Sequence, residues 1–469
     1  MSPPPAAPPA APPWRSLLAA PGWGWSLALM AIVVLGGGNW TMPLPRLPAS
    51  LLAIGMLAAA IGSRGSRFPV KLVSEDRHVL ALLALFALHL VPLPPSLWTA
   101  LPGRETASAI DTAVFGAPRW RPLSLDPAAS LRALATLIPA LAVYVAVRGG
   151  DALRRAALLR GIVLAMILAM TAAAAQLLWR DAAWLHFYPR GDYAFPVGFF
   201  TNHNHQAIFL IVCLPWLALW LGEAGTQARR GLVLAGAAAL VAVFALATAS
   251  RSGAVLLIAG LLLTGAAWLR AAPGDAPAPP RRLRHPLLLA GGVLVALMLL
   301  LIGLGGDALT SALRRSAMAD DLRLDFWPHV ANAAAAFWPY GSGLGTFFDA
   351  YAMVQPLADV SPLALNHAHD EPLEIALEAG VPGLILLISV VWRFAEAARD
   401  SWRRGPTTPA LAAARFASVV AALLLAHSLV DYPLRGFALS CLFAMAWAML
   451  AGAAESRNGQ VETAIRLNS

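Results

Sequence analysis

Apolar runs long enough to cross a lipid bilayer recur along the whole chain of 469 residues. A helix needs about 20 mostly apolar residues to cross the ~30 Å hydrocarbon core of a membrane. The composition fits this pattern, because 59% of the residues are hydrophobic and only 13% are charged, against about a quarter in an average soluble domain. Such a chain lacks the polar side chains that a water-facing surface requires. We therefore expect an all-α polytopic membrane protein.

About twelve segments have the length and composition of transmembrane helices. They cover residues 23–38, 47–62, 78–93, 130–147, 156–179, 205–222, 231–249, 253–269, 286–304, 373–392, 410–430 and 434–452. Nine of these spans lie within 23–304 and three within 373–452. The segment 1–22 begins with a Pro/Ala-rich stretch that is typical of disorder, and 453–469 forms a tail after the last span.

The distribution of basic residues predicts the orientation. When the N-terminus is placed in the cytoplasm, most of the 34 Lys and Arg residues fall in short loops on that side. Cytoplasmic loops of membrane proteins are enriched in these residues, so we expect both termini to be cytoplasmic. The same clustering accounts for the net charge of +9 without nucleic-acid binding. Loops near 94–129 and 180–204 then lie outside, as does a large loop over 305–372, in which helical patterns indicate a small lid before span 10.

Arg251 is the first residue that indicates function. It stands in the segment Thr248–Gly253 (TASRSG), between two apolar runs and on the predicted outer side. The positive-inside rule disfavours arginine there, and burying one near the middle of the bilayer costs ~2.5–3.5 kcal/mol. A helix-end arginine that reaches for lipid headgroups is the plain alternative. We favour a functional role.

Two further outer segments carry polar residues in suggestive patterns. Asn202, His203 and His205 open the sixth predicted span, where such side chains cap a helix or bind a polar ligand, and the two interpretations are equally supported. Arg323 shares a predicted helix face with Trp327, whose ring could hold the guanidinium by stacking. Taken alone, this second pattern favours an amphipathic helix on the membrane surface.

The strongest signal is a pair of histidines at a predicted helix start. His367 and His369 precede Asp370, a natural N-cap residue, and Pro372, which suits a first helical turn. The positive end of the helix dipole disfavours imidazolium, so a neutral His369 could accept a proton from a sugar hydroxyl. The same helix end favours an approaching anion. For His367, a purely interfacial role is equally supported.

Other patterns argue against alternative chemistries. The glycine-rich segment 341–347 (GSGLGTF) follows no predicted strand, so it is a close-packed turn and not a nucleotide-binding loop. The outer histidines lack zinc-ligand spacing, and we predict no metal site. Cys213 and Cys441 lie in apolar runs without a CxxC partner and are expected in the core. In 427–435 (HSLVDYPLR), Asp431 could orient a histidine or pair with an arginine, but a plain helical hairpin is favoured.

Taken together, the sequence places arginines on the outer side, offers a neutral histidine as a base and contains no nucleotide-binding motif. Arginine matches the geometry of phosphate groups, so a lipid-borne pyrophosphate at the outer leaflet is a fitting ligand. These residues favour transfer of a glycan from a lipid-linked donor.

Several motifs, in their order and spacing, resemble the O-antigen ligase/polymerase superfamily over roughly residues 190–390. The matching stretches are Asn202–Ala207, Ser250–Gly253, Arg323 with Gly345–Phe347, His367–His369, and the spacing of His369, Leu373 and Gly380. The chain departs from the pattern at Asp370, where members of the superfamily often carry Asn.

This resemblance implies a metal-independent, inverting glycosyltransferase of the bacterial inner membrane, with its site in the periplasm and no cofactor. Its donor would be a glycan linked to undecaprenyl pyrophosphate. Arg251 and Arg323 would correspond to the arginines that contact pyrophosphate, and His369 to the base for the acceptor hydroxyl. The remaining expected substrate-binding residues are Asn202, His203, His205 and His367.

The acceptor stays open among lipid A core, a second lipid-linked glycan and a protein. These acceptors correspond to an O-antigen ligase, an O-antigen or exopolysaccharide polymerase, and a protein O-oligosaccharyltransferase. The ligase is slightly favoured because the compact chain has no large appended outer domain. Two different classes are a transporter or flippase for polyisoprenoid-linked glycans and a non-catalytic scaffold. A transporter predicts charged residues near span centres and paired broken helices, and few of either occur.

Overall fold

The computed structural model describes residues 21–38, 43–63, 72–179, 182–188, 195–222, 227–271, 322–357, 360, 364–403 and 408–468. Within these ranges the chain is predominantly helical. The only strands in the described ranges are β1 (Pro92–Leu93) and β2 (Arg121–Pro122), which form one short antiparallel pair. The predicted all-α polytopic fold is therefore confirmed.

Nine helices in the described part of the chain are long and apolar enough to cross a membrane. They are α3 (Pro43–Gly62), α7 (Pro127–Arg148), α8 (Ala152–Leu178), α9 (His203–Leu221), α10 (Gln227–Ala247), α11 (Arg251–Ala271), α15 (Glu371–Arg403), α16 (Pro409–His427) and α17 (Phe437–Asn468). Each overlaps one of the predicted spans. The orientation of the spans in the membrane stays a prediction.

The other three predicted spans have different outcomes. The span 23–38 is the helix α2 (Trp23–Leu35), whose 13 residues are followed by Gly36–Gly38. At 1.5 Å per residue α2 is about 20 Å long, which is short of the hydrocarbon thickness. The span 78–93 belongs to the 17-residue helix α4 (Ser74–Leu90), which begins with charged residues. The predicted span 286–304 lies outside the described residues.

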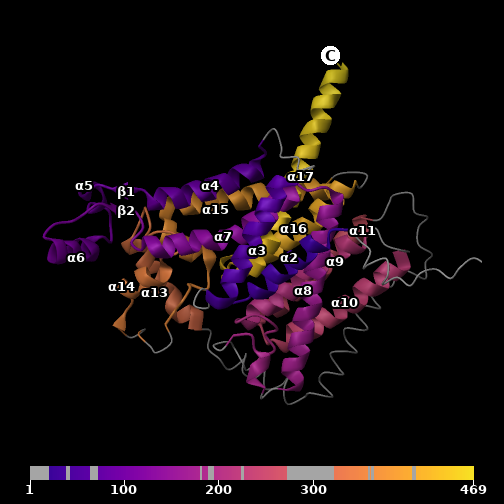
Figure 1. The fold of residues 1–469 in the computed structure, drawn as a ribbon, viewed down its shortest axis with the longest axis horizontal. Coiled ribbons are helices and arrows are strands. Elements are labelled where there is room, and N and C mark those ends of the chain that lie inside the picture. The colour runs from indigo at the N-terminus through magenta and orange to yellow at the C-terminus, as the bar shows by residue number, and fades with distance from the viewer. Residues whose placement is uncertain are drawn as a thin grey trace, which may run out of the picture.

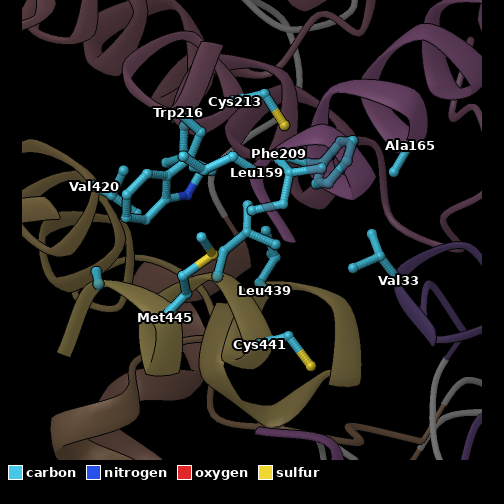
Figure 2. Close-up of a cluster of buried hydrophobic side chains, with 14 of the residues drawn as sticks. Val33, Leu159, Ala165, Phe209, Cys213, Trp216, Val420, Leu439, Cys441 and Met445 are labelled. Atoms are coloured by element: carbon cyan, nitrogen blue, oxygen red, sulfur yellow. The ribbon is translucent and has the colours of Figure 1, made fainter. Parts of the chain in front are cut away.

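Helix α9 occupies the centre of the bundle. It packs against α8, α10, α11 and α16, and 89% of its apolar stretch is buried, against 28% for α10 and α11. Figure 2 shows Phe209 and Trp216 of α9 beside Leu439 and Met445 of α17. Burial on all sides explains why α9 is apolar around its whole circumference. Cys213 and Cys441 are free and buried in this core, as predicted.

Short helices gather at one end of α4, α7 and α15 (Figure 1). They are α5 (Pro95–Trp98), α6 (Glu105–Phe115), α13 (Leu322–Ala336) and α14 (Phe347–Val354). Two further short elements are the 3-10 helices η1 (Ala183–Leu185), which follows α8, and η4 (Pro433–Arg435), which lies between α16 and α17. Helices α13 and α14 pack on the first turns of α15 through Val330, Phe347 and Leu377. The described part of the predicted outer loop 305–372 is thus a small helical unit seated on α15.

Candidate functional site

Helix α15 is divided by a kink at Gly380, and the residues before the kink form a short helical segment of their own. Gly380 has φ 54 and ψ −142, values outside the helical region. A Cβ at Gly380 would stand 2.1 Å from the carbonyl oxygen of Pro339, so only glycine fits. Residues 371–379 therefore take a direction of their own and carry three buried carboxylates, Glu371, Glu374 and Glu378.

The polar residues of four segments meet at Asp431, in the turn between α16 and α17. The side chain of Asp431 is fully buried. Its carboxylate lies 3.3 Å from His369 Nδ1, 3.7 Å from His205 Nε2 and 3.9 Å from Arg323 Nη2. We call Asp431, His205, His369 and Arg323 the Asp431 centre. The sequence pattern favoured a plain helical hairpin at Asp431, and these contacts show instead that Asp431 pairs with histidines and an arginine.

Asparagines at the start of α9 complete the shell around this carboxylate. Asn204 Nδ2 donates to Asp431 Oδ2 at 3.0 Å, and Asn202 Nδ2 reaches the same oxygen at 3.5 Å. Asn202 also caps α9, since its side chain accepts from the Asn204 backbone N–H. The backbone N–H of Tyr432 donates to Asp431 Oδ1 at 2.9 Å.

These contacts keep Asp431 ionised. Burial by itself raises the pKa of a carboxyl group, but the neighbouring imidazoles of His205 and His369 outweigh it and hold the pKa of Asp431 well below its usual value. The centre therefore contains a buried negative charge that faces two imidazoles and a guanidinium.

His369 is held in an unusual backbone conformation beside this charge. Its φ is 50, in the left-handed region that costs a non-glycine residue about 1–3 kcal/mol. Asp370 acts as the predicted N-cap, because its Oδ1 accepts from the Leu373 N–H at 2.7 Å, and burial raises the pKa of Asp370. Trp327 Nε1 donates to the carbonyl oxygen of Ala368 at 2.9 Å and so fixes the preceding peptide. The expected stacking of Trp327 on Arg323 stays a prediction.

The ring of Tyr432 lies close to three histidines of the site. Its ring centroid lies 4.1 Å from that of His367, 4.9 Å from that of His369 and 5.0 Å from that of His205. Burial raises the pKa of the Tyr432 phenol, so the hydroxyl stays protonated. Asn366 Nδ2 lies 3.4 Å from that hydroxyl oxygen.

His367 belongs to a second charged network on α15. Its Nδ1 lies 2.8 Å from Glu374 Oε1, while Glu374 Oε2 accepts from the Ala368 N–H at 2.8 Å. Arg435 of η4 lies between Glu374, at 3.2 Å, and Glu378, at 2.7 Å. Sequence spacing gave no sign of this network, because Arg435 and the two glutamates come from distant segments.

The glycine-rich segment 341–347 is the close-packed turn that was predicted. Its backbone N–H groups at Ser342 and Gly343 donate to carbonyl oxygens of α15 at 3.0 and 2.8 Å. The N–H of Phe347 donates to Glu378 Oε1 at 3.0 Å. These hydrogen bonds fasten α14 to α15. Because the N–H groups already donate to α15, they are not available to bind a phosphate.

Arg251 lies at the same end of the bundle as the Asp431 centre. It is the exposed first residue of α11, after Ala249 with φ 55. A Cβ added to Gly253 would stand 2.7 Å from the Cβ of Ala207, so the start of α11 lies against the start of α9, where His205 is found. The ring centroid of His203 lies 4.7 Å from that of Phe195, with the two rings tilted by 36°.

Within the described residues, no group of three or more His, Cys, Asp and Glu side chains could hold a metal ion. The independence from metal stays a prediction.

The comparisons with known proteins give one result. Residues 236–388 match the family model described as O-antigen ligase. This segment includes Arg251, Arg323 and His369, whereas Asp431 and the start of α9 lie outside it. A search of curated proteins finds no match. Over residues 236–388 the chain is therefore similar to the O-antigen ligase family, and this similarity supports the O-antigen ligase/polymerase superfamily and the general activity of a membrane glycosyltransferase.

Proposed function

We propose that this protein moves a glycan from an undecaprenyl-pyrophosphate donor to an acceptor hydroxyl at the periplasmic face of the bacterial inner membrane. The enzyme would be an O-antigen ligase-like, inverting glycosyltransferase that works without metal. The observation that carries this proposal is the 3.3 Å contact between His369 Nδ1 and the buried Asp431 carboxylate. A carboxylate on one imidazole nitrogen fixes the ring and leaves the other nitrogen for a substrate proton.

His369 acts as the general base in this reaction. Its Nε2 accepts the proton of the acceptor hydroxyl while the hydroxyl oxygen bonds to the anomeric carbon of the donor. The bond from that carbon to the pyrophosphate oxygen breaks, and the lipid pyrophosphate leaves with the electron pair. Attack opposite to the leaving group inverts the anomeric carbon. Asp431 stabilises the imidazolium that forms, and base catalysis of this kind contributes about 10²–10⁴-fold.

Arg251 and Arg323 bind the pyrophosphate and stabilise its growing charge. Guanidinium groups suit this task because they present several N–H donors in one plane. Arg323 is 21% exposed and lies 3.9 Å from Asp431, which supports a position at the edge of the Asp431 centre. Arg251 begins a helix at the same end of the bundle. Loss of one such charge-stabilising donor costs about 10²–10³ in rate.

The remaining expected site residues divide into two roles. Asn202 and His205 contact Asp431 and hold it, so we assign them to positioning. His203 and His367 are proposed to contact the substrate glycans.

Transfer in a purified system tests the proposal. The full-length protein is given a defined undecaprenyl-pyrophosphate glycan with lipid A core, a second lipid-linked glycan or a protein in turn. We expect product with one acceptor, and its loss in His369→Ala and Arg251→Ala variants that still insert and fold. Arg399→Ala serves as a control, because that side chain is 56% exposed and lies on α15 far along the chain from the site. Unchanged product from both site variants would overturn the assignment.

A further inference from the structure

A cavity of about 470 Å³ lies beside the Asp431 centre. Its walls come from the turn after α2, the first turn of α3, helix α7, the starts of α9, α14 and α15, and the segment from Tyr432 to Leu439. This volume is typical of small-molecule sites, which occupy about 300–1,000 Å³. The cavity is therefore large enough for a sugar residue and an attached group.

The cavity lies next to Tyr432, whose ring contacts the proposed base His369. His205, His367 and Tyr432 line it. The ring of Tyr432 contacts that of His369 at 4.9 Å, although His369 is not part of the lining. A molecule in the cavity would thus lie next to the Asp431 centre. Arg251 and Arg323 do not line the cavity either.

Arg46 supplies a positive charge to this cavity. Its guanidinium carbon lies 4.4 Å from the ring centroid of Phe437, a cation–π contact that fixes its direction. Among the described residues, no carboxylate oxygen lies within ion-pair distance of Arg46. The two glutamates of the lining, Glu374 and Glu378, are both bound by Arg435. Arg46 therefore lacks a counter-ion that the described part of the chain could supply.

The cavity lining also includes Arg132 and Asp349. Arg132 pairs with Asp126 at 3.4 Å, so its charge is already compensated. Burial and the neighbouring Asp126 raise the pKa of Asp349. Within the described residues, Asp349 lies outside ion-pair distance of Arg46.

We propose that this cavity binds a phosphate or carboxylate group of the acceptor glycan through Arg46. The inference rests on the proposed function, because it assumes two glycan substrates. A guanidinium without a counter-ion, lodged in a cavity, recognises an anion with directed N–H donors. We assign the anionic group to the acceptor and not to the donor, because Arg251 and Arg323, which are proposed to bind the donor pyrophosphate, do not line the cavity. An anion-bearing acceptor would thus be selected over a neutral one.

The test uses the full-length protein in lipid nanodiscs and one acceptor in two forms. The probe is a lipid A core oligosaccharide that carries phosphate, compared with the same molecule after phosphatase treatment. In Arg46→Gln we expect KM for the phosphorylated form to rise about 10- to 100-fold, the range of a lost charge-assisted hydrogen bond. The kcat and the KM for the dephosphorylated form should stay the same. Arg46→Lys should recover part of the affinity, and Arg399→Gln should match the wild type.

A binding measurement tests the anion site independently of the transfer reaction. Calorimetric titration of the phosphorylated oligosaccharide measures the affinity even where no transfer occurs. Equal affinity in the wild type and Arg46→Gln would refute the anion site. A rise in KM for the donor, with no change for the acceptor, would assign the anion to the donor and refute our choice of source. Absence of transfer with every acceptor, together with intact Arg46-dependent binding, would refute only the proposed reaction.

Discussion

Replacing Asp431 by Asn removes the buried charge of the site and changes its shape very little. Two opposite unit charges at the 3.3 Å between His369 Nδ1 and the Asp431 carboxylate attract by about 5 kcal/mol at an effective dielectric constant of about 20. Part of this attraction is offset by desolvation and relaxation of the centre. Since each 1.4 kcal/mol corresponds to a factor of ten, we expect kcat to fall by about 10²–10³.

The same substitution has a predicted effect on stability and its pH dependence. The pKa of Asp431 is held well below its usual value in the folded protein, so its charge stabilises the fold above the unfolded pKa near 4. That contribution is lost as the pH falls through the folded pKa. Removing one partner of a buried ion pair costs about 3–5 kcal/mol, so Asp431→Asn should unfold at lower temperature at pH 7. The difference from the wild type should shrink in strong acid.

Three measurements check this prediction together. The transfer rate with saturating substrates gives kcat, the substrate dependence gives KM, and thermal unfolding at several pH values gives the stability. Asp400→Asn is the matched control, because this carboxylate is 28% exposed and lies 3.7 Å from Arg399 near the other end of α15. A folded Asp431→Asn protein with kcat within threefold of the wild type would refute the role of Asp431.

Other substitutions test the parts that support the site. Gly380→Ala should destabilise the fold more than Gly116→Ala, because both have positive φ but a Cβ meets backbone only at Gly380, and thermal unfolding measures the difference. Glu374→Gln removes a buried partner of Arg435 and should lower the free energy of unfolding by about 3–5 kcal/mol. Glu396→Gln changes a side chain that is 39% exposed, and its free energy of unfolding should stay within about 0.5 kcal/mol of the wild-type value. Trp327→Phe removes the hydrogen bond to the residue before His369 and should lower kcat up to about tenfold without changing KM, as steady-state kinetics would show.

The spans could be predicted from the sequence because hydropathy is a local property. Nine predicted spans coincide with long apolar helices, and Asp370 caps α15 as its position indicates. The length of α2 was overestimated, since Gly36–Gly38 ends the helix although glycine does not interrupt the apolar run. The kink of α15 at Gly380 was not predicted, because the sequence shows one continuous apolar span from residue 373.

The partners within the site could not be predicted in the same way. Asp431 is separated from His369 by two transmembrane segments, and only the packing of α15 on α16 brings them together. Arg435 likewise pairs with glutamates more than fifty residues earlier. The sequence identified the residue types that carry chemistry, and the tertiary structure decides which of them meet.

The most direct test of the central claim is chemical rescue of a His369→Gly variant by free imidazole. Glycine tolerates the positive φ of this position and leaves space for imidazole beside Asp431. If His369 is the general base, transfer falls at least about 100-fold in this variant and recovers partly as imidazole is added. Transfer at the wild-type rate without imidazole would contradict the claim that His369 takes the acceptor proton.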